Sequence, residues 1–352
     1  MVTTIGAVSA DGSVSSVAGG SGPPITVRRA GDEDEPAILQ LCGAALGWHG
    51  DARDQALFRW KHRNNPFGAS PTWVAESDGQ VVAVRVFLRW DFVRPDGSVV
   101  RAVRAVDTAT LPAFQGRGLF RQLTTTAVAE LTTGDDDVGS IAFVFNTPND
   151  QSRPGYLTMG WEVVGRVPMA VAIGGVRGLL RLPGARRPAG KWSLPTSAGL
   201  SADEVLGDSS AIDALVVAAG PTTGLGTRRS ADFLRWRYAD GPVTYRALRL
   251  GRDASEGVAV FRQRKRGSSI EADVVDLLVP DDDAARRRRA LVAAVAKATK
   301  PDHLLVAQHA RRSGRAWRAD RLGPLLTWRA VTETVRPPVA DWSLALGDIE
   351  LF

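Results

Sequence analysis

The chain has 352 residues, 44% of them hydrophobic, and carries a net charge of +6. Such a length usually exceeds one hydrophobic core, so two domains are expected. A single cysteine, Cys42, excludes an intrachain disulfide framework, disfavours a cysteine-based metal site and favours a reducing, cytoplasmic setting. No apolar run approaches the length that spans a bilayer, so no membrane partner is expected.

Residues 1–24 are rich in Ser, Gly and Ala and carry no early basic cluster. This composition is typical of a disordered tail rather than of a signal peptide.

Residues 25–173 follow with the pattern of an α+β domain. The expected elements, in chain order, are a strand over 25–30, a helix over 34–48, a loop-bounded aromatic patch over 58–68, three strands over 72–111 with hairpin turns at Asp78-Gly79 and Asp96-Gly97, a helix over 118–131, a buried strand over 140–146, a short helix ended by Gly160, and one more strand.

Residues 174–223 are rich in Gly, Pro and Arg and are expected to form a linker or an inter-domain excursion. The segment 224–335 then repeats the first pattern. Phe58-Arg-Trp60-Lys-His62 is echoed by Leu234-Arg-Trp236-Arg-Tyr238, and strand-turn-strand, strand, helix and strand follow in the same order. This repetition predicts a duplicated unit, followed by a C-terminal tail over 336–352.

The two copies differ where a strand turns into a helix. The first copy reads VDTATLPAFQGRGLFRQL over 106–123, whereas the second has DDDAARRRR in place of the glycines. Glycines let successive backbone amides at a helix N-terminus approach a phosphate closely, and Arg117 can add charge. The stretch contains no G-x-x-x-x-G-K-[ST] and so does not fit a P-loop. It does not fit the dinucleotide fingerprint G-x-G-x-x-G either, because residue 121 is arginine. A tight strand–helix connection is the structural alternative.

This stretch resembles motif A of the GNAT acyltransferase superfamily, with Gln115, Gly118 and Phe120 at the marked positions. Phe120 stands where Gly or Ala is usual. Asn149, Tyr156 and Gly160-Trp161 resemble the second signature of that family. An intact first domain with a degenerate second one resembles the tandem GNAT arrangement of the enhanced-intracellular-survival type. The fold class expected from the resemblance is therefore α+β, with tandem GNAT-like domains, mixed and mostly antiparallel sheets flanked by helices, and a degenerate second copy.

The resemblance implies that the strands ending near Leu111 and Asn146 splay apart and that acetyl-CoA lies in the cleft. Backbone groups would pair with the pantetheine, and amides of the glycine turn would hold the diphosphate. The cofactor-binding residues implied in this way are Thr108, Ala109, Thr110, Gln115, Gly116, Arg117, Gly118, Leu119, Phe120, Arg121 and Asn149.

Tyr156 is implied as the general acid that protonates the leaving thiolate; packing is its structural alternative. The general base stays open between Asp107, His49, His62, a water chain, and the C-terminal carboxylate of Phe352, which the resemblance would bring into the first domain's cleft. The second half is expected to shape the acceptor pocket. Four tryptophans could line that pocket or pack in the core, namely Trp60, Trp73, Trp90 and Trp236.

The expected function is N-acyl transfer from acetyl-CoA to a primary amine of a small molecule or a lysine side chain, without a metal. The alternatives are an aminoacyl-tRNA-dependent transferase and a non-catalytic acyl-CoA-binding module. The basic run Arg286 to Arg289 lacks interleaved aromatic residues, so a nucleic-acid partner is not expected. The sequence carries no signal for the oligomeric state.

Overall fold

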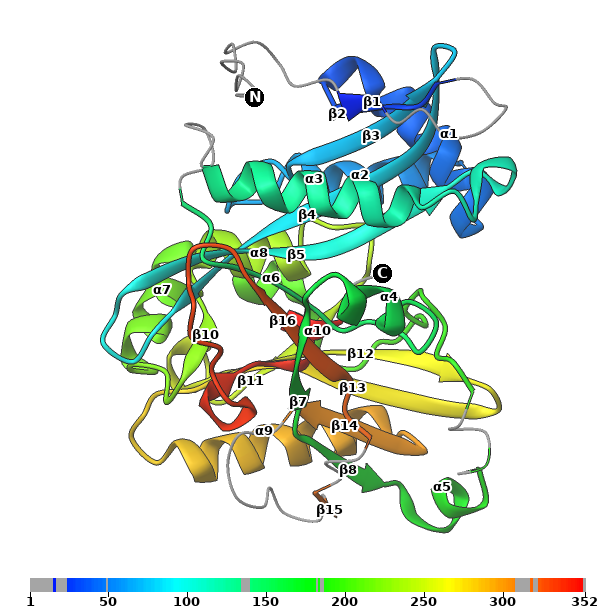
Figure 1. Ribbon diagram of the computed structural model, residues 1–352. Helices are drawn as coiled ribbons and strands as arrows, with labels where there is room; N and C mark the ends of the chain where they lie inside the picture. Colours follow the sequence, from blue (N-terminus) through cyan, green and yellow to red (C-terminus); the bar gives the residue numbers. More distant parts are fainter. Residues whose placement is uncertain are drawn as a thin grey trace, which may run out of the picture.

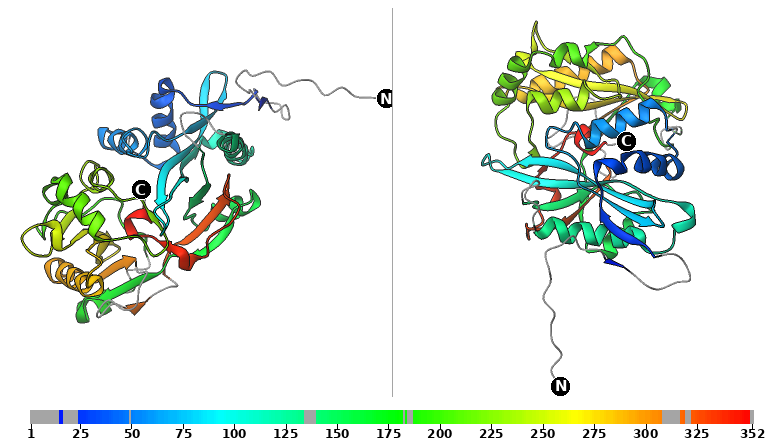
Figure 2. Two further views of the ribbon diagram at one scale, coloured as in Figure 1. Left: turned by 90° about the vertical axis from the view of Figure 1, so that its left-hand side faces the viewer. Right: turned by 90° about the horizontal axis from the view of Figure 1, so that it is seen from above.

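A computed structural model describes residues 15–16, 24–48, 50–133, 140–181, 183, 187–307, 317–318 and 322–350. Most of the tail predicted over 1–24 lies outside these residues. Two sheets, one above the other in Figure 1, make up the molecule, and the C-terminal segment, drawn in red, runs between them (Figures 1 and 2). No described helix is both long and apolar enough to cross a membrane.

The first sheet has the strand order β1-β2-β3-β4-β5-β6-β16-β7 and is mostly antiparallel, with parallel pairs at β5–β6 and at β10–β17. Its strands are β1 (Ser15–Ser16), β2 (Thr26–Arg29), β3 (Thr72–Ser77), β4 (Gln80–Val93), β5 (Val99–Thr110), β6 (Phe143–Asn146), β7 (Glu162–Arg166) and β16 (Leu325–Ala330), with β10 (Leu225–Thr227) and β17 (Trp342–Ser343) attached at the end of β4.

Apolar side chains of β4 alternate between the two faces of the first sheet. Ala83 and Phe87 pack with helix α3 (Leu119–Thr133), whereas Val84 and Val86 pack with α1 (Glu35–Leu46) on the other face. Helix α4 (Arg153–Thr158) follows β6 and contributes Tyr156 to the α3 side.

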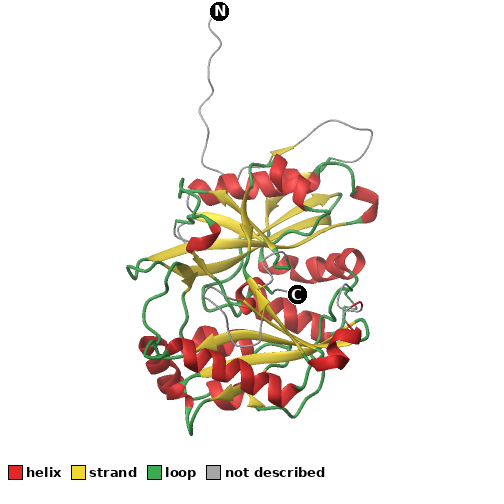
Figure 3. Cartoon of the chain, turned by 90° about the horizontal axis from the view of Figure 1, so that it is seen from below, coloured by secondary structure: helices red, strands yellow, loops and turns green. Residues whose placement is uncertain are grey.

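The second sheet has the order β15-β8-β14-β13-β12-β11-β9. Its strands are β8 (Met169–Ile173), β9 (Leu200–Ser201), β11 (Arg246–Arg249), β12 (Val258–Arg266), β13 (Ser269–Leu278), β14 (His303–Ala307) and β15 (Trp317–Arg318). Helix α9 (Ala284–Thr299) covers its outer face, as α3 does for the first sheet (Figure 3). The remaining helices are α2 (Ala52–His62), α5 (Gly175–Arg181), α6 (Ala202–Leu206), α7 (Ser209–Ala218), α8 (Ala231–Tyr238) and α10 (Leu346–Ile349).

The two halves exchange strands reciprocally. Strand β16 of the second half lies between β6 and β7 of the first sheet, and β8 of the first half lies between β14 and β15 of the second. The two segments that run through these strands are those whose sequences parallel each other, since Pro168 precedes β8 and Pro324 precedes β16. The duplication is therefore visible as two sheets, each of which contains a strand from the other half of the chain.

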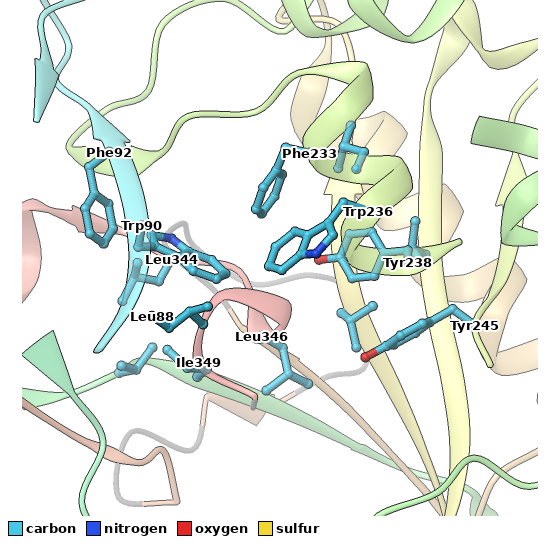
Figure 4. Packing of buried hydrophobic residues seen from close by; sticks show 14 of the residues in the cluster. Leu88, Trp90, Phe92, Phe233, Trp236, Tyr238, Tyr245, Leu344, Leu346 and Ile349 are labelled. Carbon is cyan, nitrogen blue, oxygen red and sulfur yellow. The ribbon is translucent and has the colours of Figure 1, made fainter. Parts of the chain in front are cut away.

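A large apolar core joins the halves. Leu88, Trp90 and Phe92 of β4 meet Phe233 and Trp236 of α8, and the tail residues Leu344, Leu346 and Ile349 close the same cluster (Figure 4). All four tryptophans that could have lined an acceptor pocket, Trp60, Trp73, Trp90 and Trp236, are almost wholly buried, at 3% exposure or less. Their role here is core packing.

The echoed aromatic motifs face each other. The rings of Trp60 on α2 and Trp236 on α8 stack with centroids 5.1 Å apart. The indole N–H of Trp60 donates to the carbonyl of Trp236 at 2.5 Å, and that of Trp236 donates to the carbonyl of Trp60 at 2.8 Å. The two copies of the motif therefore form a reciprocal contact between the halves.

Two sequence expectations need correction. The stretch predicted as a loop-bounded patch over 58–68 begins as the end of helix α2, which is capped by the Asp51 side chain. This helix buries Asp54, Lys61 and His62, so it lacks the apolar periodicity that identifies a helix. Two strands, β7 and β8, follow Gly160 where one was expected, because the chain crosses from one sheet to the other between them.

Candidate active site

Strands β5 and β6 pair over only three residues and then diverge. Their parallel register runs from Ala102 opposite Phe143 to Arg104 opposite Phe145. Beyond Arg104, β5 continues to Thr110, and over the described residues it pairs there with β4 alone. One edge of β5 is therefore open over 105–110, at the place where the sequence predicts the pantetheine, and such an edge can accept an extended amide chain.

A β-bulge lies inside this open stretch. The β4–β5 register shifts between Val84 and Val86, and Asp107 adopts a φ of +39°. A positive φ is uncommon for a residue other than glycine. The bulge turns the side chains of Asp107 and Thr108 toward different partners, and Ala109 and Thr110 then resume pairing with Val84 and Ala83.

Asp107 is held by two side chains from the end of α2. Its Oδ2 accepts from the Lys61 ammonium and lies 2.7 Å from Nε2 of His62, and the Lys61 side chain is fully buried. Burial opposes ionisation, but Lys61 and His62 outweigh it and hold the pKa of the Asp107 carboxyl well below its usual range. An ionised carboxylate with so low a pKa is a weak proton acceptor.

His62 is neutral near pH 7, because burial lowers its pKa more than Asp107 raises it. A carboxylate only accepts, so Nε2 carries the proton, and Nδ1 can accept from the Ser70 hydroxyl at 3.0 Å. Both ring nitrogens are engaged. The candidate base His49 lies outside the described residues.

The glycine turn is exposed and open. Gly116 and Gly118 have φ values of +74° and +78°, and no heavy atom lies within 4 Å of a Cβ built at either position. Helix α3 begins directly afterwards, at Leu119. Within the described part of the chain, no acceptor takes a hydrogen bond from the backbone amides of 116–121. Together with the helix dipole, these amides can bind a diphosphate.

The other residues of the two signatures play local parts. Gln115 donates to the carbonyl of Thr110 at 3.3 Å, and the Arg117 guanidinium lies over the ring of Phe114. Asn149 accepts from the backbone amide of Ser152 at 2.8 Å and so shapes the turn into α4. The side chain of Leu119 packs in the core under α3, which leaves only its amide for a ligand, while Arg121 is exposed.

Tyr156 is 5% exposed and has an arginine as its hydrogen-bond partner. Nη1 of Arg85, from the middle of β4, donates to the Tyr156 hydroxyl at 2.8 Å and also to the Thr108 hydroxyl. Phe120 packs edge-on to the Tyr156 ring at 5.3 Å, so the unusual residue of motif A meets the tyrosine of the second signature. Sequence reasoning missed Arg85, although an arginine within the apolar run VVAVRVFL was a visible signal.

The C-terminal segment reaches the splayed strands. Arg104, at the last β5–β6 pair, donates to the carbonyls of Asp348 and Ile349, both at 2.6 Å, and to Thr147 at 3.0 Å. Burial lowers the pKa of Arg104 to about 9. The carboxylate of Phe352, two residues past Glu350, lies outside the described residues.

A cavity of about 550 Å³ opens between α1 and α2. Its wall contains Trp48 and the carboxylates of Glu35 and Asp54. The Trp48 ring also faces the Lys61 ammonium, 5.7 Å from its centroid, and Lys61 in turn binds Asp107. Sequence reasoning missed this cavity, because only the packing of two helices creates it.

Comparisons with known proteins agree with this geometry. Residues 26–164 match the model of the acetyltransferase (GNAT) domain. A probable N-acyltransferase from Enterococcus faecalis has a TM-score of 0.59 at 14% identity, with 87% of this chain and 73% of that one covered. A GCN5-related N-acetyltransferase from Anabaena variabilis gives 0.58 at 12% identity, covering 88% and 73%.

Eis1 from Mycobacterium abscessus gives a TM-score of 0.53 at 14% identity, again covering 87% of this chain and 73% of that one. No curated protein matches the sequence significantly. At such identities the solved structures establish the fold, and the family model establishes the domain. The glycine turn, the splayed strands and Tyr156 all fall within the matched segment. Residues 26–164 therefore match a GNAT acetyltransferase domain, and the chain as a whole has a fold similar to those of the solved GNAT structures.

Proposed function

We propose that the protein moves an acetyl group from acetyl-CoA to a primary amine of a small molecule or a lysine side chain. The observation that carries this proposal is the row of amides over 116–121, which bond to no acceptor among the described residues and lie at the start of α3, beside the open edge of β5. The amides suit a diphosphate, and the strand edge suits the amides of pantetheine. The catalytic domain proposed is 25–173.

In the proposed reaction the amine nitrogen attacks the thioester carbonyl, the C–S bond breaks, and sulfur takes the electron pair and the proton of Tyr156. Tyr156 is buried next to Phe120 at the N-terminus of α3, where a thioester held by β5 would end. Asp107 and His62 are less suited to be the base that deprotonates the amine, because both are hydrogen-bonded to other side chains. The docking of the tail on Arg104 supports the terminal carboxylate of Phe352 for that role.

The cavity between α1 and α2 is proposed to receive the amine acceptor. Carboxylates and the face of a tryptophan attract a protonated amine, and Glu35, Asp54 and Trp48 line the cavity. Asp54 is paired with Lys191, whose ammonium also lies 5.1 Å from the centroid of the Trp48 ring, so an amine would have to compete with Lys191 for this part of the wall. Glu35 also binds Arg59 on the same wall, so the cavity mixes charges and favours an acceptor with polar groups beside its amine.

Calorimetric titration of acetyl-CoA on the wild type and on Gly118→Trp tests the donor site. A bulky side chain in the open space at Gly118 would displace the diphosphate, and each charged hydrogen bond lost costs about 1.5–3 kcal/mol, so we expect binding to weaken by about 100-fold or more.

Gly97→Trp is the matched control. Gly97 lies in a hairpin turn with a φ of +84° and equally open surroundings, so it imposes the same backbone strain far from the turn at 116–118. Equal loss of affinity in both variants, or no binding to the wild type at millimolar ligand, would refute the acetyl-CoA site.

A further inference from the structure

Arg85 is a buried cation. The residue is 0% exposed, and its hydrogen bonds within the described part of the chain go to two hydroxyls and not to a carboxylate. Two of its guanidinium nitrogens, Nε and Nη2, have no hydrogen-bond partner among those residues. Burying a charge in this way is costly, because neither water nor a counterion compensates it.

Aromatic rings supply part of the compensation. The guanidinium carbon lies 4.7 Å from the ring centroid of Phe87, 5.6 Å from that of Phe120 and 5.3 Å from that of Tyr156. Ring faces attract cations only modestly. The positive charge is therefore left available to an anion that forms beside it.

The direction of the hydrogen bond to Tyr156 is fixed by chemistry. Arginine has donors and no acceptor, so the Tyr156 oxygen must accept from Nη1 at 2.8 Å. The hydroxyl proton of Tyr156 takes no part in this bond and is free to be donated elsewhere. Thr108, on the open part of β5, accepts from the same nitrogen and fixes the guanidinium to the strand.

We propose that Arg85 is a positioning residue for proton transfer by Tyr156: it orients the phenol with its proton toward the leaving sulfur and stabilises the phenolate that remains. This inference rests on the proposed function. The amine nitrogen forms the new C–N bond and gives its proton to the base. The C–S bond breaks with its electron pair on sulfur, and the Tyr156 proton passes to sulfur. The phenolate next to Arg85 then regains a proton from the base through solvent.

The test compares two leaving groups in Arg85→Met, Arg85→Lys and Tyr156→Phe. When acetyl-CoA reacts, CoA leaves as a basic thiolate that needs a proton. When the thioester of acetic acid with a nitro-substituted thiophenol reacts, the thiophenolate that leaves is stable and needs no proton. We expect Arg85→Met to lower kcat with acetyl-CoA by about 10–100-fold, which is less than the roughly 10²–10⁴-fold that a general acid itself contributes, because Tyr156 is still present. With the activated thioester we expect a loss of no more than about twofold, because that leaving group gains little from an acid.

Arg85→Lys keeps the charge and should recover part of the activity, and it also guards against a folding defect in Arg85→Met. In a Tyr156→Phe background, Arg85→Met should add almost nothing, because residues that act as one unit are non-additive. Calorimetry should show that Arg85→Met binds acetyl-CoA with an affinity within about threefold of that of the wild type, which is a difference of less than about 1 kcal/mol.

Equal losses with both donors in Arg85→Met, or a full additional loss in the Tyr156→Phe background, would overturn the role of Arg85 and leave the acetyl-CoA site intact. Full activity of Tyr156→Phe with acetyl-CoA would remove the proposed acid and this inference together.

Discussion

At the scale of single residues, the candidate site is made by charged side chains buried in apolar surroundings. Asp107 is paired with Lys61 and His62, while the buried side chains of Arg85 on β4 and Arg104 on β5 bind Tyr156 and the tail. Because removing a charge from water costs free energy, a buried charge is expected to be paired with an opposite charge or to serve a function. Their concentration around the bulge at Asp107 makes this part of the first sheet the candidate functional site.

His62 gives the fold a dependence on pH. Burial lowers its pKa below the ordinary value, so the unfolded chain takes up a proton at a higher pH than the folded protein does. As pH falls below about 6.5, protonation therefore favours the unfolded state, and the free energy of unfolding should fall by up to about 1.4 kcal/mol per pH unit.

Urea unfolding between pH 7 and pH 5 measures this slope, with His62→Gln as the comparison. Glutamine can still donate to Asp107 but does not titrate, so the slope should be smaller in that variant. Identical slopes in the two proteins would show that His62 is not the group responsible.

Trp48 should matter for the acceptor and not for the donor. Trp48→Ala removes the aromatic wall of the cavity, and we expect KM for an amine acceptor to rise by about 5–30-fold, as for the loss of 1–2 kcal/mol of cation–π contact. Steady-state kinetics with acetyl-CoA held saturating measures the change. An unchanged acceptor KM would place the acceptor elsewhere.

At the scale of elements, helices α2 and α8 are joined by the stacked rings of Trp60 and Trp236 and by the hydrogen bond that each indole donates to the other residue's carbonyl. Trp60→Phe removes the indole N–H that binds the carbonyl of Trp236 and leaves a buried carbonyl without its partner. We expect a loss of about 1–3 kcal/mol beyond the cost of the smaller ring.

Trp328→Phe is a matched control, because Trp328 is also buried and, over the described residues, its indole nitrogen has no hydrogen-bond partner to lose. Denaturant unfolding compares the two variants. Equal destabilisation would mean that ring volume, and not the reciprocal hydrogen bond, stabilises this helix pair.

At the scale of the whole molecule, the exchanged strands make the two halves depend on each other. A fragment of residues 24–168 lacks β16, so β6 and β7 lose the strand that lies between them. It also exposes the apolar face of Trp90 and Phe92 that packs on the second half. We expect this fragment to show no cooperative thermal transition, and the full chain to show one transition that coincides by different probes.

Calorimetry and circular dichroism on the two proteins measure these transitions. Cooperative melting of the fragment near the temperature of the full chain would show that the first half is an independent domain despite the exchange.

The sequence by itself determined the local features. Gly116 and Gly118 indicate the turn because only glycine adopts their positive φ without strain, and alternating apolar residues indicate the strands of 72–111. The echo of Trp60 in Trp236 revealed the duplication, and the order of the two signatures indicated the GNAT fold.

Only the tertiary structure decided the non-local features. Which strand lies next to β6 depends on a segment about 180 residues later in the chain, and no local periodicity encodes that choice. Helix α2 was missed because it buries charges whose partners, Asp107 among them, come from another element. Arg85 meets Tyr156 only once β4 and α4 have packed within the first half, and Arg104 meets the tail only once the chain's end has packed against β5. A side chain's partners are fixed by packing and not by its neighbours in sequence.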